Sequence, residues 1–238
     1  MNDDNIVHEE KRANATLKII RDDNFNQSPD DNRDKYVFLV GFHRDFTVER
    51  EGFDRATVAQ VLCGGGDKYD YASIPEDERS EEEQAVLDNA SDIPSKYHVF
   101  GLEAYIHSGV VLALSQEGNF IDRRWDVSQL GAVFISREEE SDKDKARIMA
   151  LHLVEDWNDY LSGNIYGYVI EDKKGNVLDS CGGYSGDWEK SGVLDDARKE
   201  LAFHITRIEI RKRRDLHQAE DIAKAKALLK PYKLTINN

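Results

Sequence analysis

Four side chains of the types used in nucleophilic catalysis stand at expected strand ends or in the turns beside them: His107, Asp126, Asp179 and Cys181. Such positions often display catalytic groups. In a Cys-His-Asp arrangement the imidazole raises the thiolate content of the cysteine, and the carboxylate fixes the histidine tautomer. The four residues are therefore the candidate set for an enzyme or a protein that sequesters a ligand.

The same residues also have a structural interpretation. His107 and Ser108 would hydrogen-bond within a tight turn, and Trp125 would fill the core beneath it. Asp179 would cap backbone amides. No oxyanion-type motif and no glycine-rich phosphate loop entering a helix adds support for catalysis. The structural interpretation is favoured, so we assign no catalytic residue from the sequence.

Metal and cofactor binding find little support. Cys63 and Cys181 are the only two cysteines, too few for a disulfide framework or a four-cysteine zinc site. The seven histidines are scattered, and the closest pairs lack a helical ligand spacing: His98 with His107, and His204 with His217. We therefore expect no metal and no cofactor.

Charge is distributed unevenly along the chain. Residues 197–238 hold eleven Lys/Arg against five acidic residues, a net charge of +6, so the remainder carries −21 of the total of −15. A body of that charge repels nucleic acid and attracts cationic surfaces at low salt. We therefore expect no direct nucleic-acid binding by the body. We expect instead a partner-binding surface on the acidic stretch 75–95, with Glu76, Glu78, Glu81, Glu82 and Glu83.

A second candidate partner-binding group is aromatic. Tyr160, Tyr166 and Tyr184 stand among glycines, with Tyr168 and Trp188 close by in the sequence. Tyrosine and tryptophan are enriched where proteins bind partners. The packing of a helix end on a hairpin explains the group equally well.

The pattern of apolar residues predicts an α+β fold. Strand-like runs occupy 36–40, 99–107, 110–115 and 131–136, and two more at 165–171 and 176–180 flank a turn signature. A 3.6-residue period predicts an amphipathic helix over 142–161. We expect a mixed, mainly antiparallel sheet with this one packed helix, followed by a long C-terminal helix. The expected divisions are 1–35, an N-terminal strand with a mobile acidic loop; 36–190, the α+β core domain; and 191–238, the long C-terminal helix.

The C-terminal helix carries an apolar stripe longer than a compact domain usually covers. We expect a homodimer with Leu201, Ile205 and Ile208 at its centre and the basic segment 211–214 at the edge. No run of 18 apolar residues exists, and the N-terminus lacks the features of a signal peptide. The expected location is the cytoplasm, with no membrane contact.

Short motifs give one resemblance. The order His-Ser-Gly, Trp-Asp, Tyr-Leu-Ser-Gly-x-x-Tyr-Gly and Asp-Ser-Cys resembles a family of uncharacterised proteins encoded by bacteriophages and other mobile elements, over about 36–184. Gly182-Gly183 and the charged C-terminal helix depart from that pattern. The matching positions are Phe42, His43, His107, Ser108, Gly109, Trp125, Asp126, Gly131, Tyr160, Leu161, Gly163, Tyr166, Gly167, Asp179, Ser180 and Cys181.

The resemblance implies a phage origin and a host-cytoplasm setting, and it implies no particular reaction. Together with the acidic body it leads to our first hypothesis for the function. The chain would be a phage accessory protein of the anti-defence or anti-restriction type, which binds and inhibits a host protein complex through an acidic, DNA-mimicking surface. An enzyme or ligand-sequestering protein is the alternative, and a structural or assembly protein that uses the long helix is a third.

Overall fold

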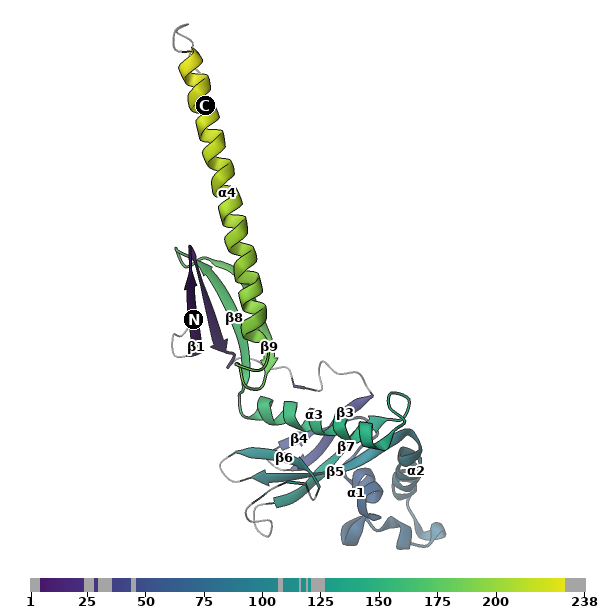
Figure 1. The fold of residues 1–238 in the computed structure, drawn as a ribbon. Coiled ribbons are helices and arrows are strands. Elements are labelled where there is room, and N and C mark those ends of the chain that lie inside the picture. The colour runs from purple at the N-terminus through teal and green to yellow at the C-terminus, as the bar shows by residue number, and fades with distance from the viewer. Residues whose placement is uncertain are drawn as a thin grey trace. The chain divides into compact units, whose positions relative to one another are not determined.

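The structure, a computed structural model, describes residues 5–23, 28–29, 36–43, 46–106, 109–115, 117–118, 120 and 127–229. The chain forms two compact units, which we call the terminal unit (Met1–Asp23 with Ile165–Asn238) and the central unit (Asn24–Asn164). Each is built around its own antiparallel sheet (Figure 1). The expected α+β class with a long C-terminal helix is confirmed.

The central unit contains a five-stranded sheet in the order β4-β3-β7-β5-β6. Its strands are β3 (Val37–His43), β4 (Phe46–Val48), β5 (Tyr97–Ile106), β6 (Val110–Leu114) and β7 (Val127–Ser136). Its helices are α1 (Arg55–Cys63), α2 (Glu81–Lys96) and α3 (Lys143–Leu161), with the short 3-10 turns η2 (Gly66–Lys68), η3 (Tyr71–Ser73) and η4 (Glu76–Glu78) between α1 and α2.

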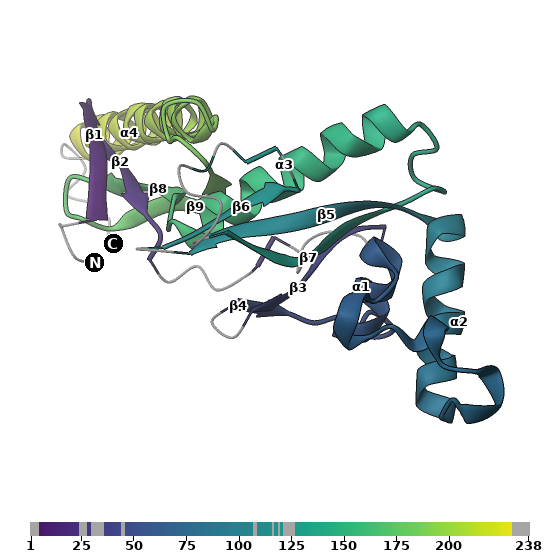
Figure 2. The ribbon, with the colours of Figure 1, turned by 90° about the horizontal axis from the view of Figure 1, so that it is seen from below.

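Both faces of this sheet are covered, which explains the unbroken apolar run of β3. Leu39 packs in a cluster with Leu153 and Trp157 of α3. Phe38, on the opposite face, packs in a cluster with Val58 of α1 and Ile93 of α2. Successive side chains of a strand point to opposite faces, so a strand buried on both sides is apolar throughout. Figure 2 shows α3 on one side of the sheet and α1 on the other.

Local signals fix the ends of α3. The side chain of Asp142 accepts hydrogen bonds from the amides of Asp144 and Lys145, which satisfies two of the free N–H groups of the first turn. The helix ends at Leu161 with Ser162 as its C-cap, and Gly163 follows in the left-handed region at φ 68°. The amphipathic helix predicted over 142–161 is confirmed.

The terminal unit contains a four-stranded sheet in the order β1-β2-β8-β9. Its strands are β1 (Ile6–Arg12), β2 (Ala15–Arg21), β8 (Ile165–Asp172) and β9 (Val177–Ser185), and its helix is α4 (Val193–Leu229). Leu17 and Ile19 of β2 and Ile170 of β8 are fully buried against the start of α4, where Val193, Ala197 and Leu201 are also fully buried.

This arrangement differs from the expected single sheet and cuts across the ranges 1–35, 36–190 and 191–238. Two separate sheets form, and all of their strand pairs are antiparallel. β2 pairs with β8, so strands from before and after the central unit share one sheet. Most of the acidic loop expected before residue 35 lies outside the described residues.

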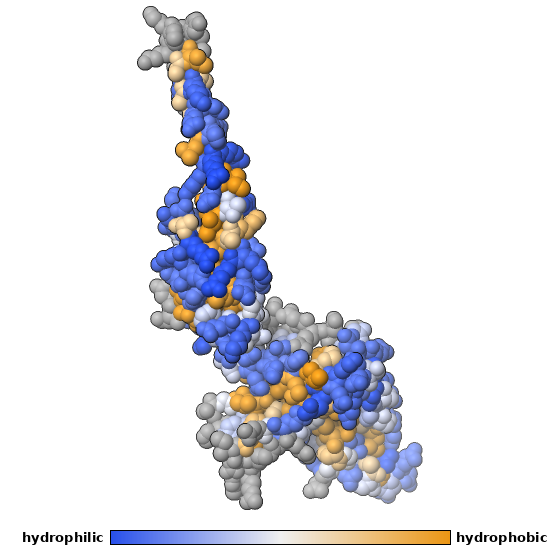
Figure 3. Space-filling model, viewed as in Figure 1, coloured by the Kyte–Doolittle hydropathy of each residue, from blue (hydrophilic) through white to orange (hydrophobic). Residues whose placement is uncertain are grey.

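α4 is 37 residues long and has two parts of different character. Residues 193–208 place a buried or half-buried stripe on the sheet, whereas every side chain of 209–228 except that of Ala225 is exposed. Figure 3 shows hydrophobic residues scattered among hydrophilic ones along this second part. Across the described ranges, no helix is long and apolar enough to cross a membrane.

Candidate functional sites

The pairing of β9 with β8 gathers two of the candidate catalytic residues on one face. Asp179 lies opposite Ile170, and Cys181 lies opposite Tyr168. Directly opposite residues of an antiparallel pair share a face of the sheet. Tyr168 and Ile170 belong to the cluster beneath α4. Asp179 and Cys181 therefore lie on the helix-covered face, at the edge strand of the sheet.

α4 adds two further polar side chains to this place. Glu200 and His204 are four residues apart, so they occupy one face of the helix. Ligand atoms of Asp179, Glu200 and His204 all lie within 4.8 Å of one another, and His204 Nε2 is 3.8 Å from Asp179 Oδ2. All three side chains are half-buried. We call Tyr168, Asp179, Cys181, Glu200 and His204 the edge cluster.

Two phenols belong to this place: Tyr168 is a member of the edge cluster, and Tyr184 lies beside it. Burial, followed by the nearby charges of Asp179 and Cys181, raises the pKa of Tyr168 to about 12. Burial, followed by the neighbouring Cys181, also raises the pKa of Tyr184. The Tyr184 hydroxyl donates to Asp196 Oδ2 at 3.3 Å. Both phenols stay protonated at neutral pH.

The structure brings together only part of the catalytic set expected from the sequence. Asp179 and Cys181 share a face, whereas His107 and Asp126 lie outside the described residues. The histidine beside Asp179 is His204, which the sequence analysis did not select. The i, i+4 spacing of Glu200 and His204 on a helix is the signal in the sequence that could have indicated this pair.

The aromatic group is divided between the two units. Tyr160, in the central unit, packs edge-on against Trp157 with ring centroids 5.7 Å apart. Tyr166, in the terminal unit, is only 5% exposed and belongs to the core beneath α4. Tyr184 is half-buried and pairs with Tyr166 across β8 and β9. Packing therefore accounts for the burial of Tyr166, which offers almost no surface to a partner.

The expected dimer contact is also partly used within the chain. Leu201 is fully buried in the core of the terminal unit, and Ile205 packs at its border. Ile208 is half-buried. Phe203, which is 53% exposed, is still open to a partner within this part of the helix, and from residue 209 onward nearly every described side chain is exposed.

The acidic stretch is held in a fixed conformation. The Ser80 side chain caps α2 by accepting from the Glu83 amide, and the Ser80 amide donates to the Glu83 carboxylate, which completes a reciprocal capping box. This bonding lowers the pKa of Glu83. Arg79 donates to the carbonyls of Tyr71 and Ile74, so the one cation between 75 and 95 holds the preceding turns in place.

The remaining carboxylates of this stretch are displayed to solvent. Glu76, Glu78, Glu81 and Glu82 are all exposed, and residues 75–95 carry eight acidic residues against one arginine. We call these four glutamates the acidic face. They stand on η4 and the first turn of α2, and Ala90 and Ile93 anchor α2 in the core of the central unit.

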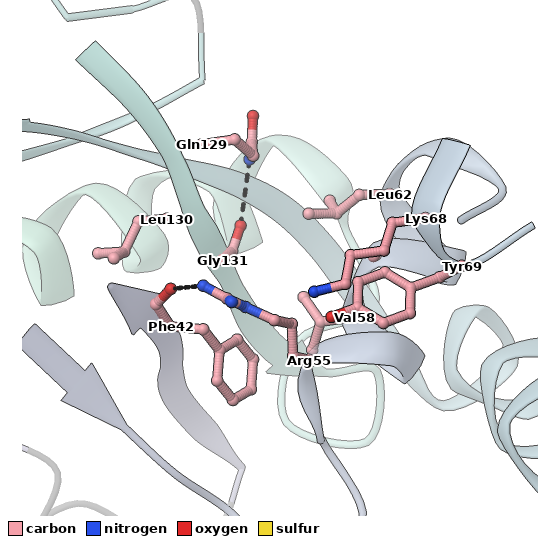
Figure 4. A pocket seen from close by; sticks show the side chains of 10 residues that line it. Phe42, Arg55, Val58, Leu62, Lys68, Tyr69, Gln129, Leu130 and Gly131 are labelled. Carbon is pink, nitrogen blue, oxygen red and sulfur yellow. Dashed lines mark hydrogen bonds between the residues drawn. The ribbon is translucent and has the colours of Figure 1, made fainter. Parts of the chain in front are cut away.

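A pocket of about 280 Å³ lies elsewhere in the central unit, between β3, α1, η2 and β7. Figure 4 shows the ammonium of Lys68 and the guanidinium of Arg55 pointing into it beside Tyr69. Arg55 also donates to the carbonyl of Phe42. Among the described side chains, two cations and no carboxylate line this pocket, which suits a small anion. Sequence reasoning missed it, because its residues come from four separate segments.

Fold and site together define an α+β protein of two antiparallel sheets, with a fixed acidic face on one unit and a polar edge cluster on the other. Comparison with protein-family models, with curated proteins and with solved structures found no match.

Proposed function

We propose that the chain is a phage accessory protein that binds and inhibits a host protein complex through the acidic face. The complex would be a nucleic-acid-handling one, of the defence or restriction type, in the host cytoplasm. The observation that carries the proposal is the exposure of Glu76, Glu78, Glu81 and Glu82 on a scaffold fixed by Arg79 and the capping box.

Fixed carboxylates are better suited to recognition than a flexible acidic tail. A partner that binds a preorganised surface loses less conformational entropy, because the bound geometry already exists in the free protein. A dense negative field also steers a basic surface to the correct face and raises the association rate. Proteins that bind nucleic acid present such basic surfaces to phosphates. The acidic face therefore offers carboxylates where such a protein expects phosphates.

The helix segment 209–228 supports self-association as a second property of the same protein. Its exposed apolar side chains include Ile210 at 62% and Leu216 at 64% exposure. Isolated helices gain most of their stability from packing, so a second copy of the chain is the proposed cover for this segment. Dimer formation would double the number of acidic faces, and two linked sites bind more tightly than one.

The alternative, an enzyme, is supported only by the shared face of Cys181 and Asp179. Cys181 is exposed on the same face as Asp179, and Cys63 is exposed with its thiol donating to the carbonyl of Ala59 at 3.2 Å. A nucleophilic Cys181 would be alkylated near neutral pH well before Cys63, since reactivity follows the thiolate fraction. Equal labelling of the two thiols would leave the edge cluster without a nucleophile.

Affinity capture from a bacterial host lysate tests the proposed function. The wild-type chain is compared with a variant in which the acidic face is neutralised: Glu76→Gln, Glu78→Gln, Glu81→Gln and Glu82→Gln. Glu83 is kept, because its carboxylate completes the helix cap. We expect the wild-type chain to retain one abundant basic protein and the variant to lose it.

A matched control separates the acidic face from net charge. Four exposed glutamates elsewhere in the central unit are neutralised in the same way: Glu51, Glu138, Glu139 and Glu155. This control carries the same net charge as the variant and should retain the partner. Equal loss from both variants would show that total charge, not the acidic face, makes the contact.

A further inference from the structure

We propose that Asp179, Glu200 and His204 bind a divalent first-row transition cation, for which Zn²⁺ is the reference ion. This inference concerns the terminal unit and is independent of the acidic face. It also revises the expectation, drawn from histidine and cysteine spacing, that the chain binds no metal.

The three side chains converge from two elements of the fold. Asp179 comes from β9, whereas Glu200 and His204 come from α4, and their ligand atoms lie within 4.8 Å of one another. β9 is positioned by its register with β8, and α4 by the buried side chains of Val193, Ala197 and Leu201. The site therefore rests on a strand and a helix that the core already fixes, and metal sites on such elements hold their geometry better than those on loops.

The three donor groups are of the kinds that transition cations accept. One imidazole nitrogen with two carboxylate oxygens is a mixed set of the type that zinc accepts. Imidazole also suits iron, nickel and copper, whereas Mg²⁺ and Ca²⁺ prefer sites built from oxygen alone. The histidine therefore directs the site toward transition cations.

The ligand atoms need to move only a short way to reach a zinc geometry. Zinc bonds of about 2.0–2.2 Å place tetrahedral ligand atoms roughly 3.4 Å apart. His204 Nε2 and Asp179 Oδ2 are already 3.8 Å apart. Small rotamer changes of the half-buried side chains would close the remaining distance without moving β9 or α4. Three protein ligands leave a fourth position for water, which is the arrangement of catalytic rather than structural zinc sites.

Equilibrium dialysis of the full chain, free of any histidine tag, against ZnCl₂ or CoCl₂ tests the site. We expect one tightly bound ion per chain. The double variant Glu200→Gln/His204→Ala should weaken binding by more than about tenfold, since outer partners of metal ligands alone change affinity 10- to 100-fold. Asp179→Asn should weaken it in the same direction.

The matched control lies on the same helix. His217 and Glu220 form an exposed pair with atoms 4.0 Å apart, and neither belongs to the three-residue group. The double variant Glu220→Gln/His217→Ala removes the same chemical groups and should leave binding unchanged. Equal weakening by the two double variants would show diffuse attraction of cations to an acidic protein and would overturn the proposal.

A measurement on the wild-type chain keeps the test independent of variant folding. Paramagnetic Co²⁺ shifts and broadens the NMR signals of an imidazole that binds it. We expect the ring signals of His204 to change at one equivalent of cobalt while those of His217 stay sharp. Unchanged His204 signals at saturating cobalt would refute the site even if the ion binds elsewhere. A thiolate-to-cobalt charge-transfer band that is absent from a Cys181→Ser variant would show that Cys181 is a ligand, and it would overturn the proposed three-residue set.

Discussion

The two units differ in how helices cover their sheets. In the central unit both faces of the sheet are covered by helices, so its polar side chains are displayed on the outside, as on the acidic face. In the terminal unit one helix covers one face and also extends past it, so polar groups gather where α4 meets the edge strand β9. A fully covered sheet thus leaves its polar groups for the proposed binding surface, whereas a sheet edge under a helix holds the proposed small site.

The largest predicted effect is on the stability of the terminal unit, and it differs between the buried and the exposed part of α4. Leu201→Ala should destabilise the terminal unit by about 2–5 kcal/mol, because it leaves a cavity in the core. Leu216→Ala, on the same helix but 64% exposed, should change stability by less than about 0.5 kcal/mol. Chemical denaturation measures both.

Hydrogen exchange then shows where the damage lies. In the Leu201→Ala variant, amides of β2, β8 and residues 193–208 should exchange faster, because the free energy of local opening is lower there. Amides of the central sheet should keep their protection. Faster exchange throughout both sheets would mean that the two units unfold as one, and the comparison would fail.

Truncation of α4 should change the oligomeric state or the folding of the terminal unit, depending on where the chain ends. A chain that ends at residue 208 keeps the buried Val193, Ala197 and Leu201, so it should stay folded and become monomeric. A chain that ends at residue 192 loses all three and should lose the terminal unit. Light scattering of the full chain should report a dimer. A monomeric full chain would remove the proposed self-association.

A smaller effect is the acid sensitivity of the terminal unit. The Arg198 guanidinium donates to Glu10 at 2.9 Å and holds the pKa of that carboxyl below its usual value. The carboxyl therefore binds a proton less readily in the folded state, so its stabilising contribution is present above the unfolded pKa of about 4.3 and is lost as pH falls through the folded pKa. Thermal unfolding between pH 7 and 3 should show a shallower decline for Glu10→Gln. Identical slopes would show that the contact adds no stability.

Local patterns made much of the central unit predictable. The strand at 36–40 and the helix at 142–161 could be predicted because period, capping residue and terminal glycine all lie within one segment. The pairing of β2 with β8 could not, because residues such as Leu17 and Ile170 meet only through long-range packing. A sheet assembled from both ends of the chain leaves no local signal.

The same distinction applies to the candidate sites. The acidic face could be predicted, since it is a single segment whose exposure follows from its composition. Asp179 was selected for its place near a turn, but its neighbours Glu200 and His204 depend on how α4 packs on the sheet. The sequence alone shows only that Glu200 and His204 are four residues apart on a helix.

Binding of the captured partner at different salt concentrations tests the central claim most directly. Exposed charges are screened beyond a Debye length of about 8–10 Å, so affinity measured by calorimetry should fall steeply between roughly 50 and 300 mM salt. Neutralising Glu76, Glu78, Glu81 and Glu82 should both weaken binding and flatten this dependence, while the thermal unfolding of the variant stays unchanged. Tight binding that is independent of salt, and equal for the wild-type chain and the variant, would contradict the acidic face as the contact surface.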